Sequence, residues 1–190
     1  TDRRILEVYK FIKSNLDIKK KLFMNVEGNS WGICCNSLHF VDLFNFFCNE
    51  YSYTIKEKSI FKWIKSKRNG FKELDNGKLE LKFGNHKLCL LSKKNSLPKN
   101  VKISIKNGKK NFLVKEKTDT FELKHNKKKI IFKNEPTSIK MTNIIKKMLL
   151  ENKSNLPCYL DSSILYYPLI EYFLTKWQVF NPRSKKVPIT

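Results

Sequence analysis

Paired segments joined by short turns constrain the fold of this 190-residue chain more than any other feature. Apolar and polar side chains alternate through residues 79–90 on both sides of Gly84-Asn85, and through residues 101–114 around Asn107-Gly108. Two-residue turns of this kind predict β-hairpins, and Asn-Gly is the strongest short signal for one. A third, weaker hairpin is expected over residues 121–132. We therefore predict an antiparallel meander with lysines on its outer face and Leu, Ile, Val and Phe on its inner face.

Helical periodicity occurs on both sides of the predicted meander. The second of four expected helices is apolar on most sides, so we expect it to be buried. The last one contains Pro168, which is expected to kink it or to reset its start. Two helices before the meander and two after it predict an α+β fold in a single domain covering residues 1–190. We expect an open-faced and mainly antiparallel β-sheet with helices packed on one face. The expected helices are 3–21, 33–48, 141–149 and 161–177, and a short strand is expected over 22–27.

The charge of the chain is strongly positive. Lys and Arg number 39 against 17 Asp and Glu, and the resulting net charge of +22 is typical of proteins that bind nucleic acids or anionic membranes. The chain also has 35 Lys but 4 Arg, 19 Asn and no Ala, which is the composition that an AT-rich coding sequence imposes on any protein. In that case lysine serves only as a solvated surface residue. A surface that binds polyanions and a mere compositional bias therefore both remain open as interpretations of the charge. With 41% hydrophobic residues, the chain is not wholly disordered.

The five cysteines follow neither a disulfide pattern nor a zinc-site pattern. Their number is odd, no pair has C-x-x-C spacing, and Cys34 and Cys35 are adjacent. We therefore expect reduced thiols, a cytoplasmic protein and no metal site. The longest apolar stretch, residues 164–174, contains a proline and a glutamate, so neither a membrane span nor a signal peptide is expected. The chain begins with Thr1 rather than Met, as a fragment of a longer protein would.

Residues 28–44 hold the densest group of polar side chains in an apolar setting. At helical spacing, Cys35, His39 and Asp42 fall on one face of the predicted helix. The i, i+3 spacing lets the Asp42 carboxylate orient the His39 imidazole, which predicts a general acid/base with His39 as the catalytic group. The alternative is a structural His-Asp pair that holds the helix to the preceding loop, and spacing alone does not separate the two.

Further candidate residues lie in loops and turns. Trp31 stands beside two glycines, where its ring could line a sugar-binding pocket, and the basic turn at 66–71 could contact a phosphate or be an ordinary turn. His86 and His125 fall at hairpin turns, where we expect them in solvent, and the three histidines show no metal-ligand spacing. The predicted substrate-binding residues are Asn29, Trp31, Cys35, Asn36, Lys67 and Arg68.

The run V-x-G-N-S-W-G-x-x-C-N-S-x-H-F-x-D-L-F, residues 26–44, resembles the start of the second domain in glucose–fructose oxidoreductase/inositol dehydrogenase-like (Gfo/Idh/MocA) proteins. More narrowly, it is similar to the bacterial branch found in surface-polysaccharide gene clusters. Further segments fit that branch in order, so the resemblance covers nearly the whole chain. They are TDRR at 1–4, WIKSKRNGF at 63–71, LPCY at 156–159, YPLIEYFLTKW at 167–177 and PIT at 188–190.

The resemblance implies how the catalytic work is divided between two domains. Members of this family have an N-terminal Rossmann domain that binds NAD or NADP and a second, open-faced domain that binds the substrate and often supports oligomers. Catalysis uses a Lys from the first domain and a His from the second. His39 matches that His, and Asp42 follows three residues later as in the family, but Cys35 stands where the family commonly has Asp. The Lys and the glycine-rich loop would lie upstream of Thr1.

The sequence therefore favours the substrate-binding and catalytic domain of an NAD(P)-dependent oxidoreductase acting on a sugar or nucleotide-sugar hydroxyl, in surface polysaccharide biosynthesis. Its expected partners are its own Rossmann domain and a second copy packed through the sheet. One alternative is a basic nucleic-acid-binding domain, against which the scarcity of Arg argues. Another is a non-catalytic assembly domain of the same fold. No G-x-G-x-x-G run occurs in the chain, so we expect it not to bind the dinucleotide alone.

Overall fold

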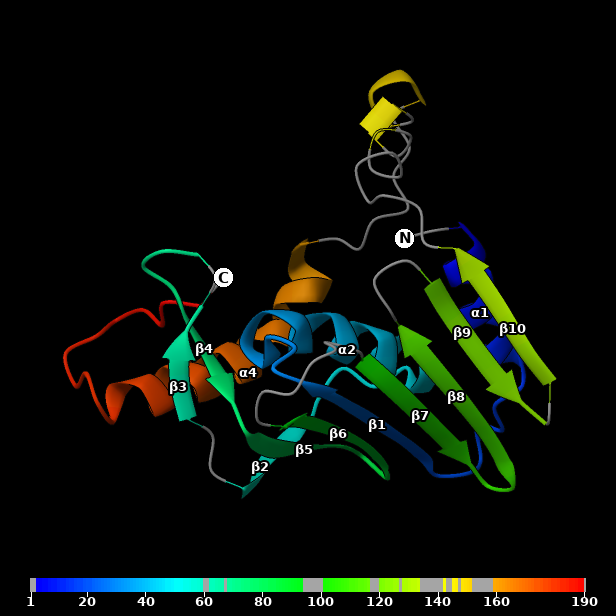
Figure 1. Cartoon of the computed structure of the whole chain (residues 1–190), viewed down its shortest axis with the longest axis horizontal. Coiled ribbons are helices and arrows are strands. Elements are labelled where there is room, and N and C mark those ends of the chain that lie inside the picture. Colours follow the sequence, from blue (N-terminus) through cyan, green and yellow to red (C-terminus); the bar gives the residue numbers. More distant parts are fainter. Residues whose placement is uncertain are drawn as a thin grey trace.

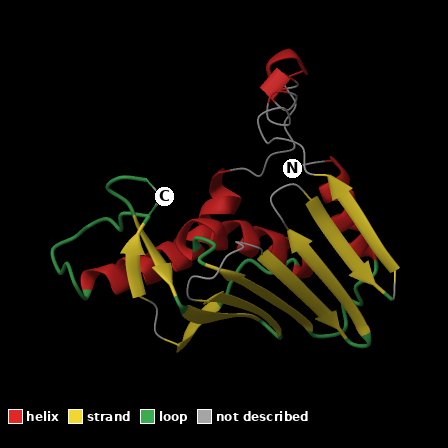
Figure 2. Ribbon diagram, viewed as in Figure 1, coloured by secondary structure: helices red, strands yellow, loops and turns green. Residues whose placement is uncertain are grey.

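Eight strands form one sheet, and the helices lie on one face of it (Figures 1 and 2). The computed structural model of the chain describes residues 3–59, 62–66, 68–93, 101–116, 120–126, 128–133, 142, 145–146, 148–151 and 159–189. Its helices are α1 (Arg3–Ser14), α2 (Ile33–Cys48) and α4 (Tyr159–Gln178). Its strands are β1 (Leu22–Asn29), β2 (Thr54–Ser59), β3 (Lys62–Lys65), β4 (Lys72–Asp75), β5 (Gly77–Phe83), β6 (His86–Lys93), β7 (Val101–Asn107), β8 (Lys110–Glu116), β9 (Thr120–His125) and β10 (Lys128–Lys133).

Strand β1 lies in the middle of the sheet, although it is the first strand of the chain. The strand order is β10-β9-β8-β7-β1-β6-β5-β2, with β1 parallel to β6 and antiparallel to β7. The other pairings in this sheet are antiparallel, and β3 and β4 form a separate two-stranded sheet. The predicted α+β class with an open, mainly antiparallel sheet is therefore confirmed. Because α2 directly follows β1, the central strand also determines where α2 begins.

Two of the hairpins turn on a glycine with positive φ. Gly84-Asn85 joins β5 to β6 as predicted, with φ +50° at the glycine. In the β7–β8 hairpin, Asn107 pairs with Lys110, so the turn is Gly108-Lys109, one residue later than predicted, with φ +59° at the glycine. Glycine at the first turn position is what a type II′ hairpin requires. The third predicted hairpin, β9–β10, is also formed.

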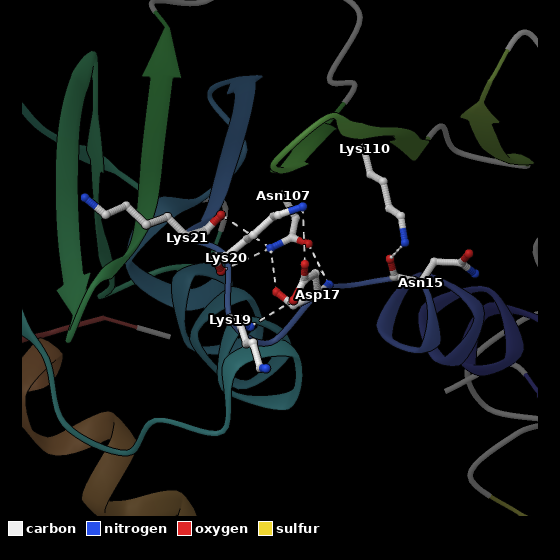
Figure 3. A network of polar contacts seen from close by, with 7 residues as sticks. All are labelled: Asn15, Asp17, Lys19, Lys20, Lys21, Asn107 and Lys110. Atoms are coloured by element: carbon white, nitrogen blue, oxygen red, sulfur yellow. Dashed lines mark hydrogen bonds and ion pairs between the residues drawn. The ribbon is translucent and has the colours of Figure 1, made fainter.

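Asn107 lies at the end of β7, and its side-chain amide holds the connection between α1 and β1 (Figure 3). Its Oδ1 accepts the N–H of Asp17 at 2.7 Å, and its Nδ2 donates to the carbonyls of Asp17, Lys20 and Lys21 at 3.1, 3.2 and 3.4 Å. The side chain is buried, so these backbone groups replace water as its partners. Helix α1 ends at Ser14, whereas periodicity predicted a helix to residue 21; the contacts of Asn107 keep residues 17–21 in a non-helical connection.

The two helices around the candidate site agree closely with prediction. α2 has the predicted bounds, and α4 begins two residues before Asp161 and continues through Pro168, so the proline does not reset its start. Of the predicted helix at 141–149, the structure describes residues 142, 145–146 and 148–149, which are helical, and the others lie outside the described residues. No helix among the described residues is long and apolar enough to cross a membrane.

The core lies between the inner face of the sheet and the helix layer. Alternate strand residues such as Met24, Leu81 and Ile105 are fully buried. Phe44 of α2 packs edge-on against Phe83 of β5, with ring centroids 5.0 Å apart. Burial of an apolar side chain of this size contributes about 1.5–3 kcal/mol. The apolar side of α2 is therefore fixed against the sheet, and its polar side is turned away from the sheet.

The two hairpin histidines have protein partners, so the prediction that both lie in solvent is wrong. His86 is half-buried, and its Nδ1 accepts the N–H of Leu22 at 3.0 Å. His125 stacks on the ring of Phe112, with centroids 4.2 Å apart. The sequence separation between His86 and Leu22 explains the error, because the start of β1 reaches this turn only through the parallel pairing with β6.

Candidate active site

Helix α2 presents one polar face to the outside of the molecule. The buried residues of the helix point toward the sheet, and they are Ile33, Cys34, Ser37, Phe40, Val41, Phe44 and Phe47. At 100° per residue the opposite face contains Cys35, His39 and Asp42. His39 is exposed, whereas Cys35 and Asp42 are half-buried. The structure thus brings together the three helix residues that the spacing predicted to share a face.

The start of α2 is held by a carboxylate from a distant strand. Gly32, in the left-handed region with φ +77°, precedes the helix and offers no side-chain cap. Instead, Glu73 of β4 accepts the N–H of Cys34 at 2.5 Å and that of Leu74 at 3.0 Å. Burial raises the pKa of Glu73, although these N–H groups act in the opposite direction. A Cβ on residue 32 would lie 3.3 Å from a Glu73 oxygen, so glycine leaves room for this contact.

The thiol of Cys34 lies beside this carboxylate. Burial, and then the charge of Glu73, raise the pKa of Cys34 well above its usual value. Asp75 lies two residues after Glu73 on β4 and is buried. Its carboxylate accepts hydrogen bonds from the hydroxyls of Ser30 and Ser92. These contacts link the ends of β1 and β6 to β4, and they fix the loop that leads into α2.

Asp42 has Tyr166 of α4 as its hydrogen-bond partner. The Tyr166 hydroxyl donates to Oδ2 of Asp42 across 124 residues of sequence. Burial raises the pKa of Asp42, while the bond from Tyr166 and the nearby charge of His39 lower it. Burial, followed by the bond to Asp42, raises the pKa of Tyr166. The carboxylate therefore lies between an imidazole on its own helix and a phenol on α4.

Trp31 and Asn36 act within the structure of the loop. Trp31 is buried, its Nε1 donates to the carbonyl of Leu91 at 2.9 Å, and its ring meets Phe40 edge-on with centroids 5.3 Å apart. Asn36 Nδ2 donates to the carbonyls of Trp31 and Gly32 at 2.6 and 3.1 Å. Both side chains support the loop before α2, and their predicted contact with a substrate stays a prediction.

Of the remaining predicted substrate residues, the structure describes Asn29 and Arg68. Asn29, at the end of β1, shares its strand face with Glu27 and lies away from α2. Arg68 is exposed in the turn between β3 and β4, where its carbonyl accepts the N–H of Phe71 at 3.3 Å. Lys67 lies outside the described residues. Among the described residues no group of three or more His, Cys, Asp or Glu side chains could hold a metal ion.

A groove of about 440 Å³ runs between α2, α4 and the last residues of the chain. Apolar side chains form most of its wall, and Glu171, Lys185 and Lys186 add charged groups. The apolar wall consists of Cys34, Leu38, Ile170, Leu174, Val187 and Ile189. Sequence reasoning did not identify this groove, and it did not assign Tyr166 to the site, because no spacing pattern joins α2 to a helix more than 110 residues later.

This arrangement can accept and hold a proton. Histidine is the side chain that exchanges protons near neutral pH, and an exposed one can reach a substrate hydroxyl, although His39 is not among the residues that line the groove. Cys35 lies one helical turn before His39.

Comparisons with solved structures find the same fold in oxidoreductases. No known protein family matches the chain by sequence, and no curated protein does so either. The chain is similar to a dehydrogenase (MviM) from Clostridium difficile, with 15% identity and a TM-score of 0.54, over 95% of this chain and 60% of that one. It is also similar to UDP-N-acetylglucosamine 3-dehydrogenase GnnA from Acidithiobacillus ferrooxidans, with 6% identity and a TM-score of 0.60, over 85% and 55% of the two chains.

A third similar structure is a super-repressor mutant of Gal80p from Saccharomyces cerevisiae. Its identity is 12% and its TM-score 0.59, over 94% of this chain and 61% of that one. The chain thus spans about 55–61% of the length of these three proteins. At these identities the likeness concerns the fold, and it extends over nearly all of this chain. The chain therefore has the fold of the Gfo/Idh/MocA oxidoreductases, over a part of their length, as its sequence resemblance implied.

Proposed function

We propose that this chain is the substrate-binding and catalytic domain of a cytoplasmic NAD(P)-dependent oxidoreductase that acts on a hydroxyl of a sugar or nucleotide sugar, in surface polysaccharide biosynthesis. One observation carries the proposal: α2 leaves His39 exposed while every buried position of the helix is used for packing. The fold shared with a UDP-N-acetylglucosamine 3-dehydrogenase supports the substrate class.

His39 takes the proton of the reacting hydroxyl in this proposal. Oxidation of an alcohol carbon requires that the O–H proton leave together with the hydride, and a ring nitrogen of His39 accepts it. Asp42 then lies beside the imidazolium, and its negative charge stabilises the new positive charge. Tyr166 holds the carboxylate in place by its hydrogen bond and so acts as a positioning residue.

The nicotinamide cofactor has no evident phosphate-binding loop in this chain. The sequence contains no G-x-G-x-x-G run, and the described glycines with positive φ lie in hairpin turns, in the β3–β4 turn and before α2. We therefore assign none of these residues to the cofactor and place its binding on a separate Rossmann domain. When bound, NAD or NADP supplies the acceptor for the hydride.

The second proposed partner is another copy of the chain, packed through the outer face of the sheet. This face is uncovered in Figures 1 and 2, since the helices lie on the other side. Each of the three glutamates described on this face lies between two lysines, as Glu27 does between Lys93 and Lys102. The other two clusters are Glu80 with Lys58 and Lys87, and Glu122 with Lys124 and Lys129.

A non-catalytic domain of the same fold is the competing function. It is favoured by one observation, that Asp42 bonds Tyr166 rather than His39. Turnover of the protein that contains this chain, followed as NAD(P)H formation, separates the two. His39→Ala should lower kcat by roughly 10²–10⁴, the usual contribution of a positioned acid/base. Since His39 is exposed, the melting temperature should stay nearly unchanged. Unchanged kcat in a folded variant would rule out the catalytic role.

A further inference from the structure

The groove between α2 and α4 has two different ends. The helices are antiparallel here, because Asp42 bonds Tyr166 one helical turn beyond the groove, whereas Cys34 and Leu174 line the groove itself. Leu38 and Ile170 lie between, one helical turn from Asp42 and Tyr166, respectively. Eight residues separate Asp42 from Cys34, which is about 12 Å of helix. The groove therefore runs from Leu38, one helical turn short of Asp42, to residues 185–189.

Cationic side chains gather at the far end of the groove. Lys185 and Lys186 line the groove itself, and Lys186 also lines an adjoining hollow of about 660 Å³ together with Arg183. None of the ion pairs between described side chains includes these three residues. This differs from the outer face of the sheet, where six lysines share three glutamates. The positive charge at the groove is thus free to meet a ligand.

The backbone that carries these lysines is anchored to the domain. Ser184 Oγ donates to the carbonyl of Lys186 at 2.6 Å, and Gln178 Nε2 donates to the carbonyl of Ser184 at 2.9 Å. Farther on, the carbonyl of Pro188 accepts the N–H of Lys72 at 2.6 Å. The backbone at the two lysines is therefore held at the groove before any ligand arrives, which lowers the entropy cost of binding one.

One acidic residue also lines the groove. Glu171 lies beside the hydroxyl of Tyr167, and its charge raises the pKa of that tyrosine. Because the two lysines outnumber Glu171, the net charge at this end of the groove is positive. The apolar wall between this end and Asp42 suits the C–H faces of a sugar ring, and a pocket with an apolar wall and few polar groups is typical of small-ligand sites.

We propose that this groove binds a phosphorylated sugar, with Lys185 and Lys186 holding the phosphate and the sugar ring lying toward Asp42 and His39. The inference rests on the proposed function, because the position of His39 decides which end of the ligand reacts. It adds the substrate class, a sugar that carries a phosphate group, and it assigns two residues to that phosphate. Phosphate is recognised by lysine as a point charge, so no bidentate geometry is required.

Calorimetry on the 190-residue chain at fixed ionic strength tests this. The probes are UDP-N-acetylglucosamine, N-acetylglucosamine 1-phosphate and unphosphorylated N-acetylglucosamine. We expect both phosphorylated probes to bind at least about tenfold more tightly than the plain sugar, as expected for charge-assisted hydrogen bonds. Tighter binding of UDP-N-acetylglucosamine would indicate a nucleotide sugar as the ligand, and tighter binding of N-acetylglucosamine 1-phosphate a simple sugar phosphate.

Two double variants of equal charge serve as test and control. Lys185→Ala/Lys186→Ala should weaken the phosphorylated probes about tenfold, whereas Lys106→Ala/Lys109→Ala, on exposed residues of the β7–β8 hairpin, should leave them unchanged. Equal weakening by both variants, no effect of either, or equal binding of the plain sugar would overturn the inference. His39→Ala should bind the probes as the unaltered chain does. Loss of turnover without loss of binding thus tests the reaction, separately from the phosphate site.

Discussion

Glu73 accepts the backbone N–H of Cys34 at 2.5 Å, so strand β4 caps a helix that starts 39 residues earlier in the chain. The first N–H groups of any helix lack partners within it, and a carboxylate at this position also interacts favourably with the helix dipole. Because His39 lies less than two turns beyond Cys34, this cap fixes the helix that carries the proposed catalytic residue.

Replacement of Glu73 should destabilise the domain. Glu73→Ala removes the cap and leaves the Cys34 N–H buried, which costs about 1–2 kcal/mol of the free energy of unfolding. Glu73→Gln keeps an acceptor oxygen and should cost less. Urea denaturation measures both variants. Glu80→Ala, which breaks only surface ion pairs, is the matched control and should cost less than about 1 kcal/mol. A Glu73→Ala effect no larger than this control would contradict the capping role.

The same residue gives a pH dependence of known sign. Burial raises the pKa of Glu73 above its usual 4.5, so the native state binds this proton more tightly than the unfolded state. Its contribution to the free energy of unfolding is therefore largest below pH 4.5 and falls as pH rises through the raised pKa. Relative to Glu73→Gln, the unaltered chain should lose stability as the pH rises above about 4.5. If the difference in free energy of unfolding between Glu73→Gln and the unaltered chain does not change with pH, the effect of burial on Glu73 is contradicted.

Tyr166→Phe should change the pH profile more than the stability. The phenol lowers the pKa of Asp42, so without it Asp42 protonates at a higher pH and the His39 imidazolium loses its counter-charge there. The acid limb of the kcat/KM profile should move to higher pH. Because Asp42 is half-buried and water can replace the phenol, the stability loss should stay below about 1 kcal/mol. Tyr167→Phe, on an exposed neighbour, should leave the profile unchanged.

Thiol labelling should distinguish Cys35 from the other described cysteines. Burial raises the pKa of Cys48 to about 11, raises that of Cys89 and raises that of Cys34 well above its usual value. Since the thiolate is the reactive form, iodoacetamide at pH 8 should modify Cys35 before Cys34, Cys48 and Cys89, as mass spectrometry of the native chain can measure. Labelling of Cys34 at the rate of Cys35 would mean that the start of α2 opens readily.

Salt should separate self-association from nucleic-acid binding. Among the described side chains, eleven lysines face outward from the sheet against three glutamates, so two such faces repel each other, and salt screens that repulsion. In sedimentation experiments the dimer fraction should rise from about 0.05 to 0.5 M NaCl. Affinity for DNA should instead collapse between about 50 and 200 mM salt. Sequence-selective DNA binding that survives high salt would favour the alternative function.

Local patterns predicted the elements, and contacts between distant segments account for the errors. The hairpin at Gly84-Asn85 and the bounds of α2 follow from turn chemistry and apolar spacing, which are properties of neighbouring residues. The end of α1 was wrong because Asn107, 90 residues after Asp17, binds the following loop. The partner of Asp42 was missed for the same reason, since Tyr166 comes from the opposite end of the chain.

The position of β1 between β6 and β7 has a consequence for how this domain assembles. Phe23 pairs with Lys87 on one side and with Lys106 on the other, so β1 is synthesised long before either partner. The β5–β6 and β7–β8 hairpins need only local contacts and should form first, whereas insertion of β1 requires closure of two long loops and should be slow. Until then the facing edges of β6 and β7 are open to other chains. Because α2 continues directly from β1, the helix that carries His39 takes its place in the same late step.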